Sequence, residues 1–167
     1  WSRGLGDVYK RQGFAIFSSN FSFNSNVFLL KSSKGSFTSS ENTFKLKIKV
    51  VNKNGQLTTC FMRSNQEHHT VACFLSDKSG LDHYSFEAGT WEWIKNWCDH
   101  FSKQNIQLIW GPGRHGPGNN LFAFIEDLDG NKVEISAELE IVHDRQTKKW
   151  PHEPKTLNLW GNAIMRS

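Results

Sequence analysis

Apolar and polar positions follow the clearest pattern between residues 55 and 141. The runs Leu57–Met62 and Thr70–Leu75 predict two strands, and Leu81–Ala88 predicts a third. Thr90 can cap a helix, because its hydroxyl can accept a hydrogen bond from a free backbone N–H. Apolar residues then recur at helical spacing, which predicts a helix that ends at about Lys103.

Three further strands are predicted after the helix. The first is Ile106–Trp110, and the loop GPGRHGPGNN follows it. The other two, Asn120–Glu126 and Lys132–Ile141, are joined by Asp129-Gly130, a strong hairpin signal. From Leu81 onward the order is therefore β-α-β-β-β. The two strands before it read as the closing half of an equal unit whose opening strand and helix are absent, so the expected fold class is α+β.

The first twelve residues, Trp1 to Gln12, do not read like the start of a fold. They contain no initiator Met, and the string GLGDVYKRQ is similar to translated sequencing-adapter read-through. We therefore expect a non-native leader, and with it the loss of an N-terminal part of the gene.

Residues 13–54 are rich in Ser, Asn, Lys and Phe. Such a biased stretch indicates an irregular insertion or a remnant of another element. Near its end, apolar residues alternate with lysines from Phe44 to Val50, which predicts a strand. Since lysines commonly protect exposed strands from pairing, we expect an edge strand here.

The patterned region 55–141 is thus expected to be the folded module. Residues 142–167 are expected to form an arm over it, anchored by the apolar burial of Trp150 and Trp160.

Composition and charge exclude some classes of protein. The chain is 37% hydrophobic and 22% charged, as in soluble globular proteins. No apolar run approaches the roughly 20 residues of a membrane-spanning helix, and no secretory signal is visible, so the expected location is the cytoplasm. The net charge is +4, but the basic residues are scattered, which argues against nucleic acid as a partner.

The three cysteines, Cys60, Cys73 and Cys98, form no CxxC pair. An odd number without a secretory context predicts reduced thiols. Cys60 and Cys73 lie in apolar runs, so we expect them to pack in the core.

Strand parity selects two residues that could carry chemistry. Side chains alternate between the faces of a strand, so His83 and Glu134 can both lie opposite the apolar faces of their strands. An imidazole and a carboxylate are two parts of a 2-His-1-carboxylate site, which suits ferrous iron with open positions. Parity alone also allows the plainer interpretation that both are solvated surface residues.

Four segments in order resemble a known family: EHHTVACF, LDHYSFEAGTWEWI, GPGRHGPGNN and LFAFIEDLDGNKVEI. Together they are similar to the C-terminal domain of type I extradiol ring-cleaving dioxygenases, the catechol 2,3-dioxygenase and dihydroxybiphenyl dioxygenase type. These belong to the vicinal oxygen chelate superfamily, which includes glyoxalase I and bleomycin resistance proteins. The resemblance covers residues 55–141, about half of the chain, and implies one complete β-α-β-β-β module plus the back half of another.

The resemblance also implies roles for single residues. His83 matches the second histidine ligand of the family and Glu134 its carboxylate ligand. His69 matches the acid-base histidine beside the substrate, and His115 a histidine that hydrogen-bonds the substrate or bound oxygen. A strand histidine and a loop histidine without such roles remain the alternatives for His69 and His115.

Two departures from the family pattern stand out. The strand that carries the first histidine ligand, which should precede a segment like Gly13-Phe14, is not found. Phe124 lines the expected substrate pocket where the family often has a tyrosine, and a phenyl ring cannot donate a hydrogen bond.

The function implied by the resemblance is Fe(II)-dependent extradiol cleavage of a catechol-type diol by dioxygen, with Mn(II) as the alternative metal. The family also implies a homo-oligomer at full length. Three alternatives stay open: a small-molecule-binding protein of the superfamily, a glyoxalase-like isomerase that recruits Glu87 or Glu138 as an additional carboxylate, and an inactive fragment.

Overall fold

The computed structural model describes residues 12–18, 22–24, 27–29, 31–32, 35–36, 45–77, 79–144, 146 and 148–165. Two helices lie in this part of the chain, α1 (Trp91–Lys103) and α2 (Pro154–Leu157). Nine strands form the main sheet: β1 (Gln12–Ser18), β6 (Lys45–Val51), β7 (Leu57–Arg63), β8 (Val71–Leu75), β9 (Gly80–Glu87), β10 (Trp110–Arg114), β11 (Leu121–Glu126), β12 (Lys132–Ala137) and β13 (Lys148–Pro151). Four short strands form two separate hairpins: β2 (Ser22–Asn24), β3 (Val27–Leu29), β4 (Lys31–Ser32) and β5 (Gly35–Ser36).

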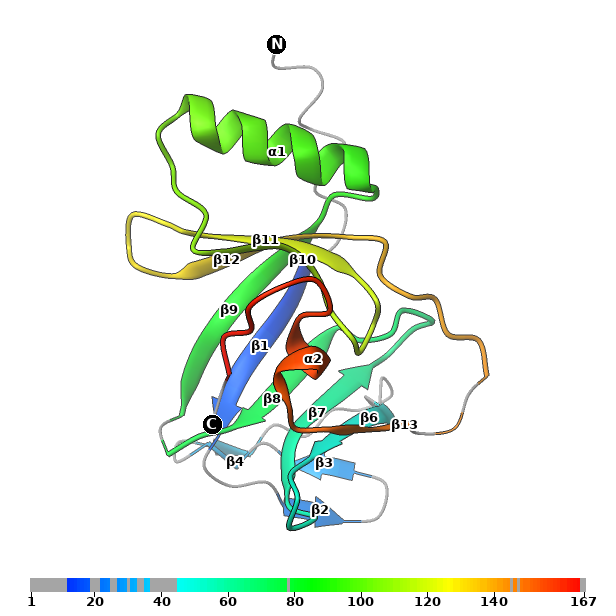
Figure 1. Ribbon diagram of the computed structural model, residues 1–167. Coiled ribbons are helices and arrows are strands. Elements are labelled where there is room, and N and C mark those ends of the chain that lie inside the picture. The colour runs from blue at the N-terminus through cyan, green and yellow to red at the C-terminus, as the bar shows by residue number, and fades with distance from the viewer. Residues whose placement is uncertain are drawn as a thin grey trace.

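The main sheet consists of two four-stranded halves with mirrored strand order (Figure 1). The order is β10-β11-β12-β9-β1-β8-β7-β6, with β13 added at the end. In each half the first strand runs parallel to the last, β9 to β12 and β1 to β8, and the two first strands meet antiparallel. The second half has the predicted β-α-β-β-β order, which confirms the α+β fold class.

The prediction that the first half lacks its opening strand is wrong. β1 contains Gly13-Phe14 and lies between β9 and β8, in the position that β9 occupies in the second half. The apolar run of β1 is typical of a central strand with partners on both sides. The Ser- and Asn-rich sequence that follows it made the whole segment 13–54 look irregular. Between β1 and β6 the described residues form the two short hairpins and no helix like α1.

The predicted leader is described only at its last residue. Gln12 begins β1 and pairs with Phe86 of β9, while residues 1–11 lie outside the described part of the chain. The idea that they are foreign to the fold stays a prediction.

The lysine-rich strand β6 is present, but the prediction that it lies at the edge of the sheet is wrong. β13, from the predicted C-terminal arm, pairs parallel with it and places Trp150 opposite Val50. Trp150 packs on the apolar cluster around Val50 and Phe61, as expected. Trp160 is 53% exposed and contacts the ring of Trp91 instead, so apolar burial anchors only one end of the arm.

One core cluster forms where α1 covers the sheet beside β11 and β12 (Figure 1). Ile94 and Phe101 of α1 pack there against the odd-numbered residues of both strands, such as Ala123 and Ile135. The even-numbered residues of these strands therefore lie on the opposite face of the sheet. Cys60 and Cys73 are buried free thiols of the core, as expected. Among the described residues, no helix is long and apolar enough to cross a membrane.

We expect Ile94→Ala to lower the free energy of unfolding by about 2–5 kcal/mol, because the side chain is fully buried and its loss leaves a cavity. The matched control is Ile106→Ala, at a position that is 38% exposed, which should cost less than about 1 kcal/mol. Urea unfolding followed by circular dichroism measures both. Equal losses would contradict the packing of α1 described above.

Candidate functional site

A cavity opens on the face of the sheet opposite α1. The four residues that the sequence singled out, His69, His83, His115 and Glu134, all line it. Aromatic side chains, including Phe124, form much of its remaining wall. The structure therefore brings the four candidate residues together around one cavity.

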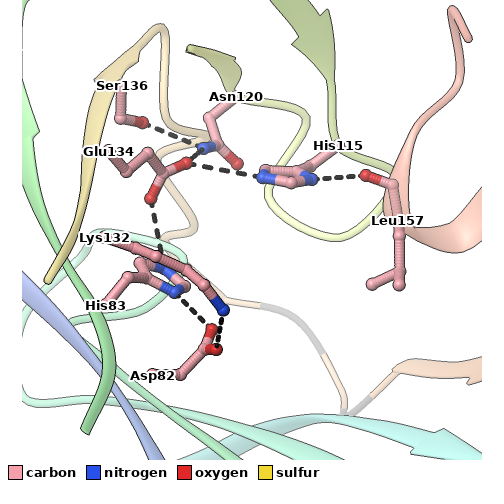
Figure 2. Close-up of polar contacts among 8 residues, drawn as sticks. All are labelled: Asp82, His83, His115, Asn120, Lys132, Glu134, Ser136 and Leu157. Carbon is pink, nitrogen blue, oxygen red and sulfur yellow. Dashed lines mark hydrogen bonds and ion pairs between the residues drawn. The ribbon is translucent and has the colours of Figure 1, made fainter. Parts of the chain in front are cut away.

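His83 and Glu134 face each other across neighbouring strands (Figure 2). His83 Nε2 lies 3.5 Å from Glu134 Oε2. The two strands run parallel, and Glu134 pairs with Ser85, two residues beyond His83. This offset brings the imidazole and the carboxylate diagonally together on one face, as strand parity predicted.

A β-bulge fixes the orientation of the His83 ring. Ala15 of β1 pairs with His83 and Ile16 with Leu81, so Asp82 is one extra residue in β9 at this point of the pairing. Bulges redirect side chains, and here Asp82 Oδ2 lies 2.6 Å from His83 Nδ1. The Asp82 side chain is fully buried, and its other oxygen lies 3.3 Å from Lys132 Nζ (Figure 2).

His115 approaches the same carboxylate from the loop after β10. Its Nε2 lies 3.4 Å from Glu134 Oε1, and its Nδ1 lies 2.5 Å from the carbonyl oxygen of Leu157 in α2 (Figure 2). Its ring stacks on Phe122 with the centroids 4.0 Å apart. The Nε2 atoms of His115 and His83 therefore lie at nearly equal distances from the carboxylate.

The protons of these two histidines can be assigned from their partners. A carboxylate and a carbonyl only accept hydrogen bonds, so Nδ1 of His83 and Nδ1 of His115 each carry a proton. In the neutral rings, both Nε2 lone pairs then point toward the Glu134 carboxylate. Three electron-rich groups meet at this point, which is stable only with a cation between them or with protonated imidazoles.

Glu134 is 6% exposed and carries the charge around which this arrangement is organised. Burial alone would raise its pKa, but hydrogen bonds and positive charge from His115 and His83 hold the pKa well below its usual 4.5. Asn120 Nδ2 lies 3.5 Å from Oε1 and donates to Ser136 Oγ at 2.9 Å. The carboxylate therefore stays ionised in the cavity.

His69 lines the same cavity, and its Nδ1 is 2.8 Å from Nδ1 of His68. Burial is the main cause that lowers the pKa of His69 to about 4; Glu134 opposes this effect, and the charges of His115 and His83 add to it. The ring is therefore neutral at pH 7.

Phe124 packs edge-on against the His83 ring, with the centroids 5.0 Å apart. It lines the cavity as predicted but offers no polar atom. It can therefore position the imidazole and a bound ring only by contact.

The donor set fits a divalent metal in part. His83 and Glu134 offer a nitrogen and an oxygen donor close enough to share one ion. The Nδ1 proton of His83 is donated to Asp82, so that Nε2 can face a metal, as in metal-ligating histidines. Within the described ranges, however, no group of three or more His, Cys, Asp or Glu side chains is arranged to hold a metal ion. His83 and Glu134 thus match two of the three donors of a 2-His-1-carboxylate centre in type and position.

The sequence did not reveal the residues that hold the site in place. These are Asp82, Asn120, Lys132 and Leu157. Asp82 directly precedes His83, but regular alternation would have put it on the other face. Leu157 contributes only its carbonyl oxygen, which leaves no signal in the residue type.

Comparisons with known proteins agree with this geometry. The sequence profile of the Glyoxalase/Bleomycin resistance protein/Dioxygenase superfamily matches residues 40–135. Among curated proteins, metapyrocatechase 2 from Cupriavidus necator is 27% identical over 85 residues, which cover 51% of this chain and 26% of that protein.

Three solved structures illustrate the structural similarity. A variant of homoprotocatechuate 2,3-dioxygenase from B. fuscum has a TM-score of 0.66 at 25% identity, over 71% of this chain and 34% of the other. The complex of the Brevibacterium fuscum enzyme with 3,4-dihydroxyphenylacetate has a TM-score of 0.66 at 24% identity, over 73% and 40%. The Mn(II)-bound glyoxalase from Novosphingobium aromaticivorans has a TM-score of 0.61 at 27% identity, over 71% and 38%. The chain thus spans less than half the length of each of these relatives.

We expect the His83 ring to be held less firmly in the variant Asp82→Asn. The amide has lost the charge that faces both Nδ1 and Lys132, which should cost about 1–3 kcal/mol of unfolding free energy. Nitrogen NMR shifts of the ring should also show a mixture of tautomers in place of protonated Nδ1. Asp77→Asn, at an exposed position, is the control. A His83 ring with unchanged shifts in Asp82→Asn would contradict the role given to the bulge.

The low pKa of His69 predicts a loss of stability in mild acid. An unfolded histidine takes up its proton near pH 6.5, whereas folded His69 takes it up only near pH 4. Stability from His69 is therefore present above pH 6.5 and falls as the pH is lowered, by up to about 2 kcal/mol between pH 7 and pH 5.

Urea unfolding across this pH range tests the effect of His69. His69→Gln should flatten the slope, whereas His143→Gln, at an exposed position, should leave it unchanged. Glu134 has a lowered pKa and loses its contribution only as the pH falls below about 4.5, so it does not affect this window. A slope that survives in His69→Gln would contradict the assignment.

Proposed function

The chain belongs to the glyoxalase/bleomycin resistance protein/dioxygenase superfamily, and we propose that its site binds Fe(II) and serves the extradiol cleavage of a catechol-type aromatic by dioxygen. The observation that carries this proposal is the meeting of two imidazole Nε2 atoms and one buried carboxylate in a cavity with an aromatic wall. The similarity to metapyrocatechase 2 and to homoprotocatechuate 2,3-dioxygenase supports it.

His83 and Glu134 would hold the metal through Nε2 and the carboxylate. When bound, Fe(II) would supply the two functions that side chains lack, chelation of a diol and activation of dioxygen. Mn(II) is the alternative metal, because the glyoxalase from Novosphingobium aromaticivorans binds it on a similar fold.

His69 would act as the acid-base group. Its ring is neutral at pH 7 and can accept a proton, but a pKa of about 4 makes it a weak base, so the transfer requires a catechol hydroxyl whose own pKa is lowered on binding. The protonated ring is then a strong acid that returns the proton readily. It lines the same cavity as Glu134, so it can meet a substrate that is bound there.

His115 would stabilise charge on oxygen. The carbonyl of Leu157 and the stacked ring of Phe122 hold its imidazole in place, so Nε2 keeps its position without reorganisation. A protonated Nε2 can donate a hydrogen bond to an oxygen that gains negative charge in the cavity.

The aromatic wall would receive the substrate ring. Phe61, Phe74 and Phe124 line the cavity beside the polar groups, and such a wall excludes water and contacts a planar ring. Because the phenyl ring of Phe124 cannot donate a hydrogen bond, orientation of the diol would depend on the histidines.

A glyoxalase-like activity is the second candidate, and the 27% identity to the Mn(II)-bound glyoxalase favours it. Such a site would need an additional carboxylate. Glu87 and Glu138 lie outside the residues that line the cavity, and Glu138 instead binds Arg114 at 3.0 Å. The donor set therefore supports the dioxygenase better.

The test is to load the protein with ferrous iron without oxygen, add a panel of catechols that includes 3,4-dihydroxyphenylacetate, and admit oxygen. We expect the yellow ring-opened product, formed slowly because, among the described residues, only His83 and Glu134 are proposed as ligands. His69→Gln should reduce the rate by about 10²-fold or more, as removal of a general acid-base group does. Glu134→Gln should release the iron and abolish the product.

The controls are Glu126→Gln and His143→Gln, which change exposed residues outside the cavity and should leave the rate unchanged. If iron stays bound and no catechol is cleaved, the proposed activity is wrong, and a binding protein of the same superfamily is favoured. Equal rates in Glu134→Gln and the unchanged protein would also contradict it.

A further inference from the structure

The two halves of the sheet meet beside the candidate metal site, where β1 pairs with β9. Gly13 pairs with Ser85, and Ser85 pairs with Glu134 on its other side, so the three residues form one row across the sheet. Ala15 pairs with His83. Residues that pair directly in a sheet share a face, so positions 13 and 15 lie on the face that carries His83 and Glu134.

The mirrored order of the strands indicates which position on β1 corresponds to His83. β1 and β9 are the opening strands of the two halves, and they run antiparallel with Phe14 opposite Tyr84. Around that pair the sequences correspond: an aromatic residue is followed by a small one and a large apolar one, Phe14-Ala15-Ile16 and Tyr84-Ser85-Phe86.

In this correspondence Gly13 of β1 is the position equivalent to His83 of β9. The two positions lie diagonally on either side of the Phe14–Tyr84 pair and on the same face. Diagonal neighbours across two strands are about 7–8 Å apart, close enough for two long side chains to reach one ion between them. Position 13 also shares its row with Glu134, whereas position 15 lies two residues farther along β1, in the row of His83 and Lys132.

β1 offers no donor for a metal at either position. Its sequence, QGFAIFS, contains no His, Asp, Glu or Cys. A ferrous centre of the 2-His-1-carboxylate type needs three protein ligands.

We propose that Gly13 occupies the third ligand position of the metal site, and that the glycine leaves this chain with a two-ligand site formed by His83 and Glu134. This inference rests on the proposed function only in assuming that a divalent metal binds there. It predicts that the chain binds metal weakly and that one substitution completes the site.

The test is a titration with Co(II), whose visible absorption reports the number and type of ligands. Gly13→His should bind Co(II) more tightly than the unchanged chain by more than about tenfold, since even the outer-shell partners of a ligand contribute that much. The absorption should also change to that of a site with an additional nitrogen ligand.

Two variants place the same histidine nearby. Phe14→His puts it on the opposite face and should give no gain. Ala15→His puts it on the correct face but two residues away from the row of Glu134, and should gain less than Gly13→His. The double variant Gly13→His with Glu134→Gln should lose the gain, because the new ligand acts together with the carboxylate.

Circular dichroism confirms that each variant is folded, and Gly13→Asp, which introduces a smaller donor, replaces Gly13→His if the larger ring disturbs β1. The proposal is overturned if the folded variant at position 13 gains no affinity, if Phe14→His gains as much, or if the gain survives Glu134→Gln. A larger gain in Ala15→His would overturn the assignment of position 13.

Catechol cleavage, measured separately, distinguishes the two proposals. Tighter Co(II) binding by Gly13→His without ring cleavage by its iron form would support the third position and contradict the dioxygenase function. Ring cleavage by the unchanged chain with no gain at position 13 would support the function and overturn the present inference.

Discussion

The buried carboxylate of Glu134 is the constraint on which the site depends. An ionised carboxylate that is almost fully removed from water is stable only among partners of opposite charge or hydrogen-bond donors. The two imidazoles supply this environment, and each has its far nitrogen held by a separate acceptor. Removing any one of these contacts leaves a buried polar group without its partner, so the bulge at Asp82, the loop at His115 and the end of α2 depend on one another.

Segments far apart in the chain provide these contacts. His83 comes from the first strand of the second half, Glu134 from its last strand, and the acceptor for His115 from α2 beyond β13. The pairing of β13 with β6 carries the C-terminal segment back over the first half. The segment after residue 141 therefore helps to orient a catalytic candidate as well as covering the core.

Strand parity and turn signals predicted the second half of the sheet and the facing of His83 and Glu134. Both depend on regular alternation, which the sequence displays directly. The contact between Asp82 and His83 could not be predicted, because a bulge breaks that alternation and depends on pairing with β1. The pairings of β1 with β8 and β9, and of β13 with β6, join segments far apart in the sequence. Neither composition nor local periodicity determines such pairings.

The two halves differ in their side chains at corresponding positions, and this difference makes the cavity. Glu134 pairs with Ser85, and in the first half the residue of β8 that pairs with Ala15 is Ala72. Gly13 and Ala72 thus correspond to His83 and Glu134. Ala72 lines the cavity together with Phe74 of the same half. The second half thus supplies His83, His115 and Glu134 to the cavity, while the first half supplies His69 and the apolar side chains of Phe61, Ala72 and Phe74. The proposed loss of a ligand at Gly13 is therefore part of a wider difference between the halves, since the first half has small residues where the second has its donors.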